Sequence, residues 1–189
     1  MKKTNQNNSQ QFALAALLIG FAALSRLLPH PMNFTPMLAI AIFGGATLPR
    51  RLALAIPLAA MFLSDVALGY GFGPMNLVIY SCIAAGTLLG WSLRQKRTTA
   101  LTLGAALGGS MLFFVVTNFV VWLGPMMAPP FDYPHTLAGL GKCYWMALPF
   151  FRNSLAGDLA WTTGIFAVYD AARAWGASRG ANVREQLSL

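Results

Sequence analysis

The chain has 189 residues, of which 57% are hydrophobic and 10% are charged, and its formal net charge is +8. Because so few residues are charged, they cannot cover the surface of a soluble globular domain. The composition therefore indicates a multi-pass membrane protein in one domain. The positive charge does not indicate nucleic-acid binding, because the basic residues fall in short gaps between apolar runs.

The apolar runs predict an all-α bundle of six transmembrane helices. Residues 1–11 are expected to form a polar cytoplasmic tail, 12–176 the transmembrane domain, and 177–189 a second cytoplasmic tail. A signal peptide is the alternative for the first run, but the long polar stretch before it favours an uncleaved span. In chain order, the spans are expected near residues 12–28, 36–48, 52–69, 75–93 and 99–124, followed by a short apolar piece at 137–150 and a last span near 153–175.

The distribution of Lys and Arg predicts the orientation, because cytoplasmic loops carry an excess of basic residues. We expect a protein of the bacterial inner membrane with both termini on the cytoplasmic side. The loops at 29–36, 70–74 and 125–136 are then expected on the outer side. Three basic residues then lie on the outer side, namely Arg26, Lys142 and Arg152. The other ten lie inside, namely Lys2, Lys3, Arg50, Arg51, Arg94, Lys96, Arg97, Arg173, Arg179 and Arg184.

Polar side chains gather near the outer ends of the predicted spans. An ionisable group at bilayer depth costs roughly 2.5–3.5 kcal/mol, so it normally faces a partner, a cavity or a substrate. Two hypotheses stay open for Asp65 and Arg152. Either they form a structural ion pair near Asn118, or they contact a ligand in a pocket that opens outward. Apolar residues are expected to close this pocket on its inner side. Asp158 lies on another face of its helix from Arg152 and cannot be its partner. The other candidate pocket residues are Arg26, Asn33, Tyr70, Trp122, Tyr133 and His135.

Cys82 and Cys143 show no metal-binding spacing, and their default role is apolar packing. The alternatives are a disulfide between them, or a soft ligand for a metal that the substrate carries. His30 and His135 lie beside prolines in outward loops, where hydrogen bonding is favoured over metal or haem ligation. We find no Walker A loop, dinucleotide fingerprint, nucleophile elbow or zincin motif. We therefore expect no ATPase of the protein's own and no enzyme of these classes.

Several segments carry a family resemblance, among them Arg-Leu-Leu-Pro-His-Pro at 26–31, Leu-Ser-Asp at 63–65 and Leu-Pro-Phe-Phe-Arg-Asn at 148–153. Together with residues 117–122 and 133–139, they resemble the S components of energy-coupling-factor (ECF) vitamin transporters, and within that family the BtuM type, which is linked to cobalamin. The resemblance implies a six-helix bundle with an outward vitamin pocket roofed by loops. It also implies a cysteine that ligates the cobalt of the corrin, a role that falls to Cys82, with Cys143 as the weaker candidate.

The resemblance leaves open whether the protein works with an ECF transmembrane scaffold and its ATPases or alone. It predicts capture of cobalamin or a related corrinoid for uptake, with the lipid bilayer as surroundings and no nucleic-acid partner. Two alternatives stay open. One is an S-component-like transporter of another small vitamin or precursor, and the other is a membrane redox protein with His30 and His135 as axial haem ligands.

Overall fold

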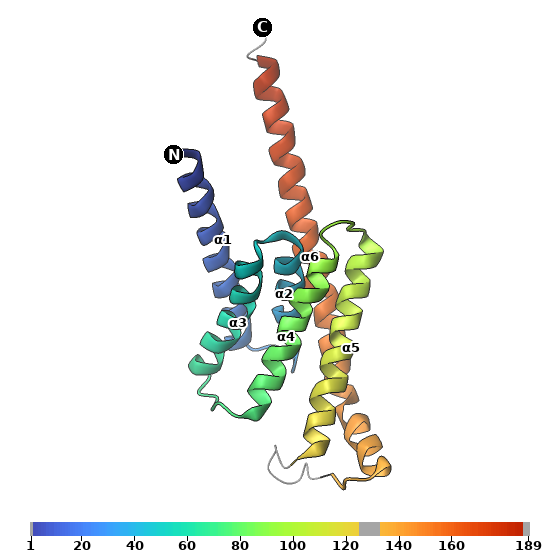
Figure 1. Cartoon of the computed structure of the whole chain (residues 1–189). Coiled ribbons are helices and arrows are strands. Elements are labelled where there is room, and N and C mark those ends of the chain that lie inside the picture. Colours follow the sequence, from blue (N-terminus) through green and yellow to red (C-terminus); the bar gives the residue numbers. More distant parts are fainter. Residues whose placement is uncertain (1, 125–132, 187–189) are drawn as a thin grey trace.

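The computed structural model describes the backbone of residues 2–124 and 133–186 and the side chains of 14–124 and 133–179. Within these ranges the chain is all α-helical, and the termini extend from one end of the helical body (Figure 1). The α3–α4 connection, the end of α5 and the start of α6 lie at the opposite end. The six helices are α1 Lys2–Leu27, α2 Met37–Thr47, α3 Arg50–Ala67, α4 Pro74–Ser92, α5 Thr99–Leu123 and α6 Leu137–Gln186.

Five of the predicted spans correspond to separate helices, but the predicted break before the last span is wrong. Residues 137–150 and 153–175 belong to the single 50-residue helix α6, which contains Pro149. Proline removes one helical hydrogen bond, and neighbouring helices can compensate for that loss. Both predicted tails also contain helix, because α1 begins at Lys2 and α6 continues to Gln186.

Among the described residues, two helices are long and apolar enough to cross a membrane. They are α4 and α5, with mean hydropathies of 1.3 and 1.9 over an 18-residue window. Leu14–Leu27 and Met37–Thr47 are shorter apolar helices. Since about 20 apolar residues span a bilayer, α2 with 11 residues is too short to cross one alone without help from its flanks.

The core is built around α2, whose residues from Met37 to Gly45 are all buried. The helix packs against α3, α4 and α6. Its approach to α4 depends on two glycines: a Cβ on Gly90 would lie 2.1 Å from the carbonyl oxygen of Ile42, and one on Gly45 would lie 2.2 Å from that of Thr87. Small residues at such a crossing let two backbones come close together.

The ends of α2 and α4 are joined by a side chain from the α4–α5 connection. Arg94 donates from Nε to the carbonyl oxygen of Gly45 at 2.6 Å, and from Nη2 to that of Leu48. These carbonyls lie at the C-terminal end of α2, where helical partners are missing and a cation is favoured. These two hydrogen bonds help to hold the end of α2 against the end of α4, at the end of the bundle from which the termini extend.

Candidate functional site: a three-helix polar network and a hairpin cluster

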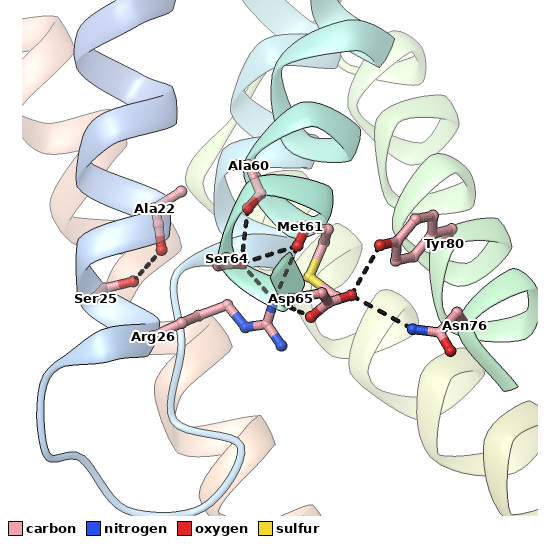
Figure 2. A network of polar contacts seen from close by, with 9 residues as sticks. All are labelled: Ala22, Ser25, Arg26, Ala60, Met61, Ser64, Asp65, Asn76 and Tyr80. Atoms are coloured by element: carbon pink, nitrogen blue, oxygen red, sulfur yellow. Dashed lines mark hydrogen bonds and ion pairs between the residues drawn. The ribbon is translucent and has the colours of Figure 1, made fainter. Parts of the chain in front are cut away.

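Asp65 is a buried carboxyl near the end of α3, with 2% of its surface exposed. Nη1 of Arg26, in the last turn of α1, lies 2.6 Å from its Oδ1 (Figure 2). Arg26 also donates to Ser64 Oγ at 2.5 Å and to the carbonyl oxygen of Met61 at 3.3 Å. The guanidinium is therefore held by three acceptors, all of them on α3.

Helix α4 contributes the remaining partners of Asp65. The Tyr80 hydroxyl donates to Asp65 Oδ2 at 2.8 Å, and Asn76 Nδ2 lies 3.5 Å from the same oxygen. Asn76 and Tyr80 are four residues apart, so they project from one face of α4. Arg26, Ser64, Asp65, Asn76 and Tyr80 are called the Asp65 network below. It satisfies the carboxylate from two helices and ties α1, α3 and α4 together.

The hypothesis of an ion pair between Asp65 and Arg152 is wrong. The cationic partner of Asp65 is Arg26. Helix α1 packs along α3, whereas α3 and α6 have no Cα atoms within 8 Å of each other in the described part of the chain. Arg152 is instead exposed on α6, and it makes no ion pair with any residue that the structure describes.

A second group of predicted residues lies where α5 meets the start of α6. The indole Nε1 of Trp122 donates to the carbonyl oxygen of Pro134 at 2.9 Å, and its ring meets that of His135 edge-on at 5.6 Å between centroids. Asn118 uses its amide on its own helix, donating to the carbonyl oxygen of Phe114 at 2.8 Å. These residues, with Tyr133 and Cys143, are called the hairpin cluster below.

Tyr133 and Cys143 complete the hairpin cluster. Burial and, to a smaller extent, the neighbouring Cys143 raise the pKa of Tyr133, so its hydroxyl stays a neutral donor. Cys143 is 2% exposed, and its Sγ lies 3.4 Å from the carbonyl oxygen of Asn118. The side chains of Trp122, Asn118 and Cys143 all bond to backbone carbonyl oxygens, which is typical of residues that shape a helical hairpin.

The other predicted pocket residues belong to neither group. Asn33 adopts a φ of 63° in the connection before α2, a left-handed conformation that asparagine tolerates. Tyr70 is 56% exposed after α3. His30 is exposed, and its Nδ1 lies 2.6 Å from the carbonyl oxygen of Leu28. The structure therefore divides the predicted polar ring into two clusters and several exposed residues.

Arg152 borders a surface hollow of about 540 Å³. Pro149, Asn153 and Ala156 line it as well, so all the lining residues lie within two turns of α6. The guanidinium and the amide give this hollow its polar groups. Because one helix alone lines it, the hollow is open at the surface and does not enclose a ligand by itself.

Cys82 lies in α4, two residues beyond Tyr80, and is 4% exposed. It does not line the hollow beside Arg152. Both cysteines are free thiols, so the alternative of a disulfide between them is wrong for this structure. Among the described residues, no three His, Cys, Asp or Glu side chains lie together as metal ligands would.

Two sets of residues were not identified from the sequence. Asn76 and Tyr80 complete the Asp65 network, and their spacing of four residues after a glycine-rich connection is the signal that could have revealed them. Ser110 and Asp158 form the second set, with Ser110 Oγ 2.6 Å from Asp158 Oδ2 between α5 and α6. That contact joins residues 48 apart, and neither helix carries a motif that predicts it.

The comparison with known families adds one finding. The chain belongs to a family of unknown function, DUF6580, whose model matches residues 6–179. Neither a curated protein nor a solved structure matches the chain. The match spans the Asp65 network, the hairpin cluster and the hollow beside Arg152, so all three lie within the region that defines the family.

Proposed function

We propose that the chain is a six-span protein of the bacterial inner membrane. Large apolar side chains are exposed along both helices that are long enough to cross, such as Leu77 (71%) and Leu88 (53%) on α4 and Leu107 (47%) on α5. A large apolar surface that is exposed in the isolated chain indicates contact with an apolar partner such as lipid. In the hydrocarbon region of a bilayer, backbone N–H and C=O groups must also be hydrogen-bonded within the protein, as they are in helices. The all-helical fold satisfies that second condition within the described residues.

The placement of basic residues supports cytoplasmic termini. Arg50 begins α3, and Arg94 and Arg97 lie between α4 and α5. Both connections are at the end of the bundle from which α1 and α6 extend (Figure 1). Basic residues collected at one end of a helical bundle are typical of the cytoplasmic side.

We infer further that the protein captures cobalamin or a related corrinoid from the outer side, as an S-component-like protein. The observation that carries the inference is the hollow of about 540 Å³ beside Arg152 and Asn153. A guanidinium and an amide suit the amide side chains of a corrinoid, and Pro149 suits its apolar face. Uptake then proceeds either through an ECF scaffold with its ATPases or by the protein alone.

Cobalt ligation by Cys82 requires a change in the bundle. The thiol is buried, and a corrinoid is larger than the hollow. Helices α4 and α6 have no Cα atoms within 8 Å of each other in the described part of the chain. Binding must therefore separate the helices between them far enough to bring Cys82 and the hollow to one ligand, which shifts the population toward an open state. A soft thiolate would then occupy one axial position of the cobalt.

The test is a visible-absorption titration of the purified protein with aquacobalamin. We expect the parent protein to bind and to shift the corrin bands. Cys82→Ser should abolish the shift, because the hydroxyl is a poor ligand for cobalt at nearly constant volume. Cys143→Ser is the matched control, since it changes an equally buried thiol, and it should behave like the parent. Arg152→Gln should weaken binding without changing the spectrum of the bound form.

Each contrary result has its own meaning. The same spectral shift in the parent and in Cys82→Ser would refute thiolate ligation by Cys82. Failure of the parent to bind any corrinoid would refute the substrate and favour a transporter of another small vitamin. A haem absorption band in the purified protein would support the redox alternative, and it should then disappear in His30→Ala and His135→Ala.

A further inference from the structure

Asp158 is a second buried carboxyl, and among the described residues its surroundings contain no cation. It is 7% exposed in the middle of α6, and its only side-chain partner in the described part of the chain is the hydroxyl of Ser110 on α5. The two helices that pack along α6 are α2 and α5. Neither Met37–Thr47 nor Thr99–Leu123 contains an acidic, basic, histidine, cysteine or tyrosine residue.

The remaining charged or titratable groups near Asp158 point elsewhere or are already engaged. Arg152 is on α6 itself but six residues away, on another face, and exposed. The connection before α2 reaches α6 through Phe34, beside Gly157, and its His30 is exposed. Helix α1 reaches α6 through Phe21, which packs on Trp161, and its Arg26 is bound to Asp65. An ionised Asp158 would therefore be a buried charge without compensation, which is strongly unfavourable.

A neutral carboxyl fits the hydrogen-bond arrangement at this point. Ser110 Oγ lies 2.6 Å from Asp158 Oδ2 and 3.0 Å from the carbonyl oxygen of Ala106. A hydroxyl has one proton to donate and can also accept. If Asp158 carries a proton, it donates to Ser110, and Ser110 donates to Ala106, so the carboxyl proton and the hydroxyl proton each have an acceptor.

A line of hydroxyls leads from Asp158 toward the end of the bundle that carries the termini. Thr162 is one turn further along α6, fully buried, and its Oγ1 has no hydrogen-bond partner among the described residues. The next residue, Thr163, lines a hollow of about 350 Å³ together with Thr102 of α5. That hollow also contains Arg97 and Asp170, which form an exposed ion pair. The hydroxyls of Thr162 and Thr163 thus lie between the buried carboxyl and a polar, open space, although no direct hydrogen bond joins either of them to Asp158 among the described residues.

We propose that Asp158 and Ser110 form a proton-binding site on the seam between α5 and α6, in exchange with the hollow at Thr102 and Thr163 through Thr162. The carboxyl holds its proton while the two helices are packed and releases it when they separate. The site gives the bundle a means to couple helix separation to proton release. It does not depend on which solute the protein carries.

The test is infrared spectroscopy of the substrate-free protein at neutral pH. We expect a carbonyl band of a protonated carboxylic acid that shifts in D₂O and is lost in Asp158→Asn. Asp170→Asn, an exposed carboxyl on the same helix, is the matched control and should keep the band. Thr162→Val should keep the band and slow its shift in D₂O, because it interrupts the line of hydroxyls. Absence of the band from the parent protein, or its persistence in Asp158→Asn, would overturn the proposal.

A second measurement covers the case in which Asp158→Asn does not fold. The packed state binds a proton that an ionised carboxyl in water does not bind at neutral pH. The stability of the parent must then fall as pH rises from mildly acidic to mildly alkaline, because the unfolded state binds fewer protons. A thermal midpoint that is flat or rises over this range in the parent would contradict the proposal without any reference to corrinoid binding.

Discussion

Asp65 and Asp158 are both buried, at 2% and 7% exposure, yet their surroundings differ completely. Asp65 lies near a helix end and receives an arginine from α1 and two donors from α4. Asp158 lies in the middle of α6 and has a single hydroxyl. A long arginine side chain reaches the first site from the end of its own helix, whereas the middle of the bundle is enclosed by helices without ionisable residues. Position along the helix therefore decides whether a buried carboxyl meets a cation or only a hydroxyl.

The largest effect is expected from removing the cation of the Asp65 network. Arg26→Gln leaves the carboxylate of Asp65 buried with only Tyr80 and Asn76, and we expect a loss of about 3 kcal/mol in the free energy of unfolding. Combining Arg26→Gln with Asp65→Asn should recover part of that loss, because no isolated charge remains. Equilibrium unfolding in detergent measures both variants.

The control for this double-mutant cycle of Arg26 and Asp65 is Arg152→Gln, which changes an arginine that does not contact Asp65. The losses of unfolding free energy in Arg152→Gln and Asp65→Asn should add within about 0.5 kcal/mol, as they do for distant sites. A larger coupling would show that Arg152 reaches Asp65 and would contradict the assignment of Arg26 as its partner.

A smaller effect is expected from Tyr80→Phe, which deletes one donor and keeps the ion pair. Loss of a single hydrogen bond to a charged group should cost about 1.5 kcal/mol in the free energy of unfolding. Tyr70→Phe is the matched control, since the Tyr70 side chain is largely exposed, and it should change little. Equal effects of the two variants would mean that the Tyr80 hydroxyl contributes nothing to the Asp65 network.

The smallest effect is expected at the exposed ion pair between Arg97 and Asp170, whose side chains are 28% and 51% exposed. Arg97→Gln should cost under about 1 kcal/mol, and added salt should reduce the difference from the parent. Unfolding in low and high salt measures this. A loss as large as that of Arg26→Gln would show that the difference in burial does not make the two ion pairs differ in their contribution to the free energy of unfolding.

The positions of the helices were largely predictable from the sequence. Hydrophobic runs and the breaks between them located α2 to α5 within a few residues, because apolar length is a local property. The continuity of α6 was not predictable, since Pro149 is a local signal for interruption that the packed helix overrides. The polar candidates do not form the one ring that the sequence predicted, because the structure places them in two clusters and at several exposed positions.

The sequence by itself determined which residues are costly to bury, because the chemistry of the side chain decides whether a charge must be desolvated. Tertiary structure alone decided which partner each of them receives. Arg26 reaches Asp65 because α1 packs along α3, and Tyr80 joins because α4 returns beside it. Asp158 receives only Ser110 because the neighbouring helices α2 and α5 carry no charge. Such contacts join residues that are far apart in the chain, and the packing angles and registers that create them are set by the whole bundle.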